Sequence, residues 1–197
     1  MVVDEDLEFV TLCQRGDIDA FRPLVEKHQR KMLNIAYRMI GDYETACEVV
    51  QDAFLSAYKA IRKFRGEATF STWLCRIVIN LSKNRIKQMK ARLEREGVSL
   101  DAPIETEDGQ VLHDPPAQEP SVLEQMERKE VQTAVQGCIN ALDDDYREVL
   151  VLRDIQGFSY DEIGEILKIP GGTVKSRLFR ARDALKDGLK KVFGERS

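Results

Sequence analysis

Apolar side chains recur at the spacing of an α-helix through most of this 197-residue chain, and no stretch of any length alternates as a β-strand does. The clearest stripe lies in residues 43–64, at Ala46, Val49, Val50, Ala53, Phe54, Ala57, Tyr58, Ile61 and Phe64. Similar spacing predicts helices over 4–15, 18–40, 70–95 and from 123 onward. Because each apolar stripe needs another helix to cover it, the chain is predicted to be all-α.

Residues 97–121 interrupt this periodicity. They hold six Asp or Glu residues, no Lys or Arg, and several prolines among few large apolar side chains. Such a segment is too polar to bury a core. We therefore predict two small helical domains, residues 1–95 and 122–197, joined by a flexible acidic linker over residues 96–121.

Residues 159–191 have the pattern of a helix, a tight turn and a second helix. Ser159 and Glu162 have the spacing of a capping box. The run Pro170-Gly171-Gly172 is predicted to end the first helix. The second helix has an apolar stripe at Val174, Leu178, Ala181, Leu185 and Leu189. This arrangement is typical of a helix-turn-helix that binds DNA.

The opposite face of that second helix is predicted to contact DNA. At about 100° per residue from Val174, the outward positions are Thr173, Lys175, Ser176, Phe179 and Arg180. Basic groups can bind guanine edges or phosphates, hydroxyl groups can bind either, and a phenylalanine can touch a thymine methyl group. An ordinary amphipathic helix with a solvated basic face is the alternative for this helix taken alone.

The net charge is −4, but the basic and acidic residues are concentrated in different segments of the chain. Residues 59–95 contain eleven Lys or Arg and only two acids. A basic helix after the aromatic loop that contains Phe64 and Phe70 suits a nucleic-acid strand, although core packing is the alternative for Phe70 and Trp73. In contrast, the polar face of residues 43–64 is acidic, with Glu44, Glu48, Gln51 and Asp52. It is either a docking surface for a basic partner or a solvated face.

The sequence disfavours a metalloprotein, an enzyme, a secreted protein and a membrane-spanning protein. The four cysteines, Cys13, Cys47, Cys75 and Cys138, have no CxxC spacing, and only two histidines accompany them. We expect buried free thiols, no metal site and no cofactor. No cluster of carboxylates or nucleophile with a base suggests catalysis. The sequence shows no signal peptide and no apolar run of about 20 residues, so we expect a cytoplasmic protein without direct membrane insertion.

Two separated parts of the chain resemble one known family. The first consists of VVQDAF at 49–54, FRGEATFSTWL at 64–74 and RIVIN at 76–80, and is similar to sigma domain 2. The second consists of YREV at 146–149, GFSYDEI at 157–163 and GTVKSRL at 172–178, and is similar to sigma domain 4. Their order, and the short gap between them, resemble a bacterial sigma-70 family factor of the extracytoplasmic-function (ECF) group, which lacks the intervening domain 3.

The resemblance implies a transcription initiation factor with no enzymatic activity. In domain 2, Glu48, Gln51 and Asp52 would bind a coiled coil on the β′ subunit of core RNA polymerase, which also offers its β subunit as a contact. Residues Phe64, Arg65, Ser71 and Asn80 would capture a flipped base of the minus-ten promoter element. Domain 4 would read the minus-thirty-five element as duplex through Thr173, Lys175, Ser176, Phe179 and Arg180. An anti-sigma factor, often membrane-bound in this group, is the expected regulator.

Two other functions fit parts of the sequence. A stand-alone helix-turn-helix regulator would bind duplex DNA as a dimer, and would need neither the segment 64–92 nor core polymerase. A helical nuclease would need clustered carboxylates or a histidine near a nucleophile, and the sequence offers neither. Specific transcription with added core polymerase separates the three.

Overall fold

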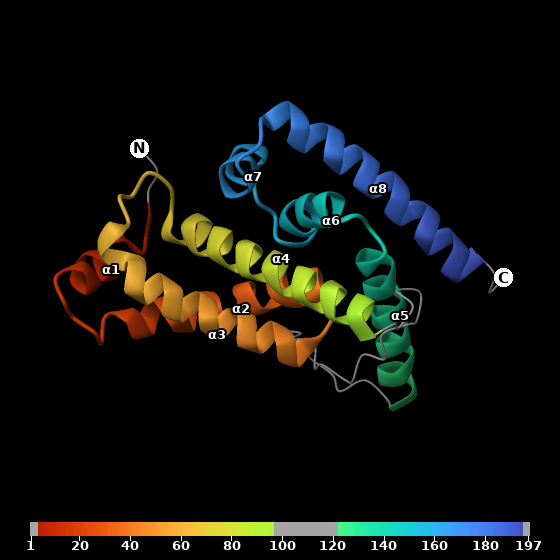
Figure 1. Cartoon of the computed structure of the whole chain (residues 1–197), viewed down its shortest axis with the longest axis horizontal. Coiled ribbons are helices and arrows are strands. Elements are labelled where there is room, and N and C mark those ends of the chain that lie inside the picture. Colours follow the sequence, from red (N-terminus) through yellow and green to blue (C-terminus); the bar gives the residue numbers. More distant parts are fainter. Residues whose placement is uncertain (1–3, 97–121, 195–197) are drawn as a thin grey trace.

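The computed structural model describes residues 4–96 and 122–194 (Figure 1). This part of the chain is helical, and no strand occurs in it, which confirms the all-α prediction. The acidic linker predicted for residues 96–121 lies almost entirely outside the described residues.

The N-terminal half consists of α1 (Leu7–Gln14), α2 (Phe21–Ile40), α3 (Tyr43–Ala60), the short 3₁₀ helix η1 (Ile61–Lys63) and α4 (Phe70–Glu96). Helices α2, α3 and α4 all pack against one another, and α1 contacts α2 and η1 at one end (Figure 1). Their apolar stripes meet in a core that includes Leu24, Met32, Ile35, Ala53, Phe70 and Leu74.

The turn between α2 and α3 is set by two residues. Gly41 has a φ of +88°, in the left-handed region that favours glycine, and its amide donates to the Tyr37 carbonyl at 2.7 Å. The Asp42 carboxylate then accepts from the Thr45 amide at 2.8 Å and caps α3. The chain therefore reverses within two residues, which places α2 and α3 side by side.

The C-terminal half consists of α5 (Val122–Asn140), α6 (Asp144–Leu150), the single-turn π-helix η2 (Val151–Ile155), α7 (Tyr160–Leu167) and α8 (Gly171–Gly194). The predicted capping box is present: the Ser159 hydroxyl accepts from the Glu162 amide, and the Glu162 carboxylate accepts from the Ser159 amide at 2.8 Å. Buried Val174, Leu178 and Ala181 pack α8 onto α6 and α7.

The turn between α7 and α8 differs from the prediction. Helix α7 ends at Leu167, and Lys168 adopts the left-handed conformation with a φ of +57°. Pro170 instead precedes the first turn of α8, where its carbonyl accepts from the Thr173 amide at 2.9 Å. Proline suits that position because the first amides of a helix have no partner within it. The Pro-Gly-Gly run therefore starts the second helix rather than ending the first.

Two predictions of burial are wrong. Leu7, expected to be buried, lies in the first turn of α1 with 52% of its surface exposed, and Val10 and Cys13 cover that side of the core instead. Cys47 is exposed, whereas Cys13, Cys75 and Cys138 are buried free thiols as expected. Burial raises the pKa of Cys75 to about 12, so this thiol stays protonated.

The two halves of the chain pack against each other. Helix α2 contacts α5 and η2, and α4 contacts α7. The buried core continues without a break from the α2–α3–α4 bundle into the α6–α7–α8 bundle. The proposed boundaries at residues 95 and 122 stay predictions, with α4 and α5 on either side of them.

Candidate nucleic-acid interface

The outward face of α8 gathers the residues predicted to read duplex DNA. Phe179 has 74% of its surface exposed, more than any other large apolar side chain of the described residues. Lys175, Ser176 and Arg180 are exposed beside it, and Thr173 is half-buried. The Arg180 guanidinium donates to the Tyr146 hydroxyl of α6 at 3.5 Å. All five predicted residues therefore lie on one side of the helix, opposite the buried stripe.

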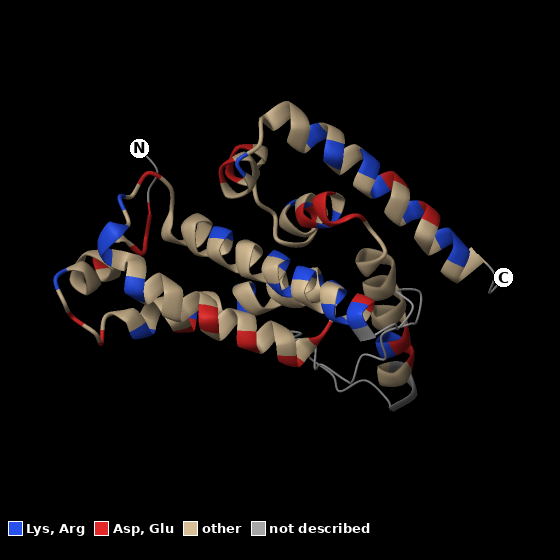
Figure 2. Ribbon diagram, viewed as in Figure 1, with Lys and Arg blue, Asp and Glu red and all other residues tan. Residues whose placement is uncertain are grey.

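Other basic residues of α8 are used within the domain. Arg177 donates to Asp145 at 2.5 Å and to Glu148 at 3.5 Å. Arg182 makes two hydrogen bonds to the Asp154 carboxylate, at 2.6 and 2.8 Å. These pairs fix α8 against α6 and η2. Lys and Arg lie along much of α8 (Figure 2), but these pairs make the basic face that is open to DNA narrower than the number of charges suggests.

The loop between η1 and α4 borders a second candidate site. A hollow of about 360 Å³ is lined by Lys63, Phe64, Arg65, Glu67, Ala68, Trp73, Arg76 and Glu165. Phe64 is mostly buried, with its ring 5.1 Å from that of Trp73, while Arg65 is exposed near Glu67. A hollow with an aromatic wall and basic side chains at its rim is suited to one nucleic-acid base.

The structure only partly gathers the four residues predicted for the minus-ten element. Phe64 and Arg65 line the hollow, and Ser71 lies half-buried in the first turn of α4. Asn80 is exposed on α4, nine residues beyond Ser71, which corresponds to about 14 Å along the helix axis. Lys63 and Arg76 line the hollow and were not singled out from the sequence, because a helical pattern does not show which basic residues flank a loop.

The acidic face of α3 holds the third predicted set. Glu48, Gln51 and Asp52 are all exposed. The Glu48 carboxylate is ion-paired with Arg85 of α4, so it is partly neutralised within the domain. Gln51 also borders an apolar groove of about 870 Å³ between α2 and α3, in which Leu55 has 50% of its surface exposed. This groove was not predicted, since many of its apolar residues, such as Val25, Val50 and Phe54, lie on stripes that were expected to form the core.

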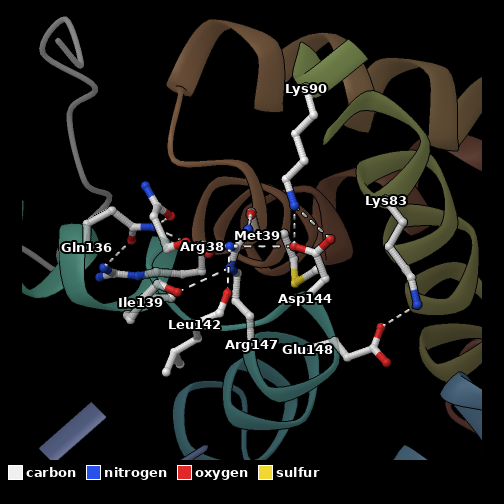
Figure 3. Close-up of polar contacts among 11 residues, drawn as sticks. Arg38, Met39, Lys83, Lys90, Gln136, Ile139, Leu142, Asp144, Arg147 and Glu148 are labelled. Atoms are coloured by element: carbon white, nitrogen blue, oxygen red, sulfur yellow. Dashed lines mark hydrogen bonds and ion pairs between the residues drawn. The ribbon is translucent and has the colours of Figure 1, made fainter. Parts of the chain in front are cut away.

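Basic residues of α4 bind the C-terminal half of the protein (Figure 3). Lys83 donates to the buried Glu148 carboxylate at 2.8 Å, and Lys90 lies 3.1 Å from Asp144. Arg76 donates to the Glu165 carbonyl at 2.6 Å, beside the hollow described above. Lys83 and Lys90 belong to the basic helix that was predicted to face nucleic acid, but in this structure both are paired with acidic residues of α6.

Arg147 and Arg38 complete the contact between the two halves (Figure 3). The buried Arg147 guanidinium donates to the Met39 carbonyl of α2 at 2.8 Å and also to three carbonyls around the α5–α6 turn: Ile139, Asn140 and Leu142. Burial lowers the pKa of Arg147, and nearby aspartates oppose that effect. Arg38 donates to the Gln136 side chain at 2.8 Å.

The described residues contain neither a metal-binding cluster nor a membrane-spanning helix. Across residues 4–96 and 122–194, no group of three or more His, Cys, Asp or Glu side chains is placed to hold a metal ion. None of the helices in these ranges is long and apolar enough to cross a membrane.

Comparisons with known proteins match both halves of the chain. The family model for sigma-70 region 2 matches residues 24–92, and that for sigma-70 region 4 matches residues 132–185. The chain is 37% identical over 192 residues to RNA polymerase sigma-H factor of Pseudomonas aeruginosa, with 98% of this chain and 97% of that protein covered. It is 38% identical over 182 residues to ECF RNA polymerase sigma factor SigW of Bacillus subtilis, with 90% and 92% covered.

A solved structure agrees with this result. CnrH, in complex with the cytosolic domain of CnrY, superposes with a TM-score of 0.68 at 26% identity, covering 95% of this chain and 99% of CnrH. Two family models in the expected order and relatives that match over almost the full length identify the family. The chain belongs to the sigma-70 family of RNA polymerase sigma factors, within its extracytoplasmic-function group.

Proposed function

We propose that this protein binds core RNA polymerase and directs it to specific promoters, without catalysing a reaction itself. The observation that carries the proposal is the outward face of α8, where Phe179 is exposed between basic and hydroxyl side chains, opposite the buried Val174, Leu178 and Ala181. The Phe179 ring adds little to the packing of the fold, and it is free to contact a thymine methyl group in duplex DNA.

Recognition of the minus-thirty-five element is assigned to Thr173, Lys175, Ser176, Phe179 and Arg180. Helix α8 would enter the major groove with its first turns, as the second helix of a helix-turn-helix does. Each good base contact discriminates by about 1–3 kcal/mol. Lysine and arginine contacts to phosphate would add affinity that falls as the salt concentration rises.

Recognition of the minus-ten element is assigned to Phe64, Arg65, Ser71 and Asn80. The hollow beside the loop offers an aromatic wall for a base that has left the stack. Because Asn80 is further along α4, it would contact a neighbouring nucleotide or hold the strand on its way to the hollow. Asparagine pairs well with a base edge.

Binding to core polymerase is assigned to Glu48, Gln51 and Asp52, with the β′ coiled coil as the partner and the β subunit as a further contact. The exposed acids support a basic partner, and the adjoining groove between α2 and α3 supplies apolar surface that such a helical partner would cover. This interaction places the protein in the cytoplasm.

Regulation by an anti-sigma factor, which in this group is often anchored in a membrane, is part of the proposal. Support comes from CnrH, whose solved structure contains the cytosolic domain of a second protein, CnrY.

Arg180→Ala tests the assignment of the minus-thirty-five residues. The side chain is exposed, so its loss should leave the fold intact. We expect about tenfold weaker binding to a cognate minus-thirty-five duplex, less transcription from that promoter, and unchanged capture of core polymerase. An equal loss of polymerase binding would show that α8 is not a separate DNA reader.

A further inference from the structure

The loop of residues 64–69 carries much of the proposed minus-ten site, but side chains from outside it hold its two ends. Arg65, Gly66 and Glu67 are exposed. Gly66 has a φ of +71°, and no atom lies within 4 Å of the place where a Cβ would stand. The middle of the loop therefore takes little support from packing, and its shape depends on how its ends are fixed.

Gln14, the last residue of α1, fixes the first end. Its side-chain nitrogen donates to the Ile61 carbonyl at 3.0 Å and to the Phe64 carbonyl at 2.8 Å. A side-chain amide has two N–H groups, and both are used here. The acceptors are the first residue of η1 and the first residue of the loop. One side chain thus sets the direction in which the loop leaves η1.

Asp4 fixes the second end. One oxygen of its carboxylate accepts from the Phe70 amide at 2.8 Å, and the other accepts from the Asp6 amide at 3.1 Å. Phe70 opens α4, where amides have no partner within the helix. Asp6 is buried, and its carboxylate binds His28 at 2.7 Å and Lys27 at 2.8 Å. Asp4 is therefore anchored to α2 through its neighbour.

An aromatic cluster joins the two ends of the loop to the hollow. The rings of Phe64 and Phe70 are 6.2 Å apart, and that of Trp73 is 5.1 Å from Phe64 and 5.8 Å from Phe70. The His28 ring lies 5.6 Å from Phe70 on the other side. A shift of either loop end would move a ring that packs directly against Trp73, which lines the hollow.

We propose that the N-terminal segment, through Gln14 and Asp4, holds the loop in the shape that captures the displaced base. These are positioning residues: they touch the backbone at the loop ends and not the DNA. The inference rests on the proposed function, since it assigns to the N-terminal segment a share in minus-ten selectivity.

Four variants of the full chain test this inference. Gln14→Met keeps the length of the side chain and removes the donors, while Asp4→Ala removes the acceptor. Asp4→Asn retains one acceptor oxygen, for the Phe70 amide, and loses the one that accepts from the Asp6 amide. Thr11→Ala is the matched control, because the Thr11 hydroxyl donates only within α1, to the Leu7 carbonyl at 2.7 Å.

Two readouts separate positioning from folding. One is binding of a short single-stranded DNA, selected from a random pool by the wild-type chain on core polymerase, compared with the same DNA after replacement of its most strongly selected base. The other is the fluorescence of Trp73, the single tryptophan of the sequence. Binding of the minus-thirty-five duplex serves as the internal reference.

We expect Gln14→Met and Asp4→Ala each to weaken binding of the selected DNA about five- to tenfold, to reduce discrimination against the replaced base, and to shift Trp73 emission. Thr11→Ala should resemble the wild type, Asp4→Asn should lie between Asp4→Ala and the wild type, and duplex binding should not change. Unchanged discrimination in Gln14→Met and Asp4→Ala, or an equal loss of duplex binding, would overturn the inference. Absence of base discrimination in the wild type would overturn the proposed minus-ten function itself.

Discussion

Glu148 is a buried carboxylate between two cations. It accepts a hydrogen bond from Lys83 of α4 and another from Arg177 of α8, and only 2% of its side chain is exposed. Burial raises its pKa above the ordinary value of 4.5, and the hydrogen bond from Lys83 offsets part of that rise. Glu148 thus links the two halves of the protein, although burial destabilises its charged form.

The raised pKa predicts that the contribution of Glu148 to the unfolding free energy depends on pH. Because the folded-state pKa is raised, the folded protein binds the proton more tightly than the unfolded chain does. The contribution of this residue is therefore fully present below about pH 4.5 and is lost as the pH rises through the folded-state pKa. We expect the unfolding free energy of the wild type, minus that of Glu148→Gln, to fall over this range in urea titrations. A difference that stays constant or rises with pH would contradict this.

Phe179 and Leu178 form a matched pair for separating function from stability. Phe179→Ala removes a side chain that is 74% exposed, and the unfolding free energy should change by less than about 0.5 kcal/mol. Leu178→Ala removes one that is 1% exposed and should cost about 2–5 kcal/mol. Duplex binding at low temperature, with both variants folded, should be weakened by Phe179→Ala more than by Leu178→Ala. The reverse order would show that Phe179 does not contact DNA.

Sequence reasoning at the residue scale predicts which way a side chain points better than it predicts its partner. Helical geometry correctly placed Lys175, Ser176, Phe179 and Arg180 on the outer face of α8. It gave no partner for Arg177, which adds to the positive charge of the same helix and bonds to Asp145, thirty-two positions earlier. The partner lies on another element, and a single sequence does not show which elements meet.

At the scale of elements, helix α3 and the end of α7 illustrate what the spacing of apolar residues can and cannot predict. The stripe over residues 43–64 predicted the start of α3 and its exposed acids, although α3 ends at Ala60 and the 3₁₀ helix η1 follows it. The stop of α7 at Lys168 could not be predicted, because a lysine in the left-handed conformation leaves no signal in the sequence, whereas Pro170 leaves a strong one. The apolar groove beside α3 was missed because apolar residues on two helices predict a core and do not show that it is open.

The α3 face gives a prediction about polymerase binding. Gln51→Lys with Asp52→Lys reverses the charge of the exposed face and spares Glu48, which is paired with Arg85. We expect capture of core polymerase to fall at least tenfold, with little change in thermal unfolding, because both side chains are exposed. Glu8→Lys, an exposed acid on α1, is the control and should bind normally. Normal binding by the double variant would remove α3 from the interface.

At the scale of the whole molecule, the packed arrangement does not fit promoter binding by both domains at once. A compact chain of this length has a radius of gyration of about 16 Å. The minus-ten and minus-thirty-five elements are about 25 base pairs apart, or about 85 Å along the duplex at 3.4 Å per base pair. Under the proposed function, the two halves therefore separate before both elements are bound, and the pairs from Lys83 to Glu148 and from Lys90 to Asp144 break.

Lys83→Glu should favour separation. It places a second carboxylate against buried Glu148, and that repulsion exists only while the halves are packed. We expect a larger radius of gyration by small-angle X-ray scattering than in the wild type. Lys87→Glu makes the same change of charge at an exposed position of α4 and should leave the radius unchanged. Equal radii in both variants would mean that the Lys83 pair does not hold the halves together.

The contact between the halves could not be predicted from the sequence. Two domains and a linker follow from composition alone, because residues 97–121 are acidic and proline-rich. That the acids of α6 bind the basic residues of α4 depends on side chains 54 and 65 positions apart, brought together by packing of α5 on α2 and α7 on α4. The separation of basic and acidic segments in the sequence allows such a contact between the halves, but it does not show which residues form it.

The central claim is that this chain gives promoter specificity to a larger polymerase. The most direct test mixes the purified full-length protein with core RNA polymerase and genomic DNA fragments, and sequences the 5′ ends of the transcripts formed. We predict start sites that depend on the added protein and share two upstream motifs at a constant spacing, with fewer transcripts when Arg180 is replaced by Ala. Transcripts whose start sites are the same with and without the protein would contradict the account.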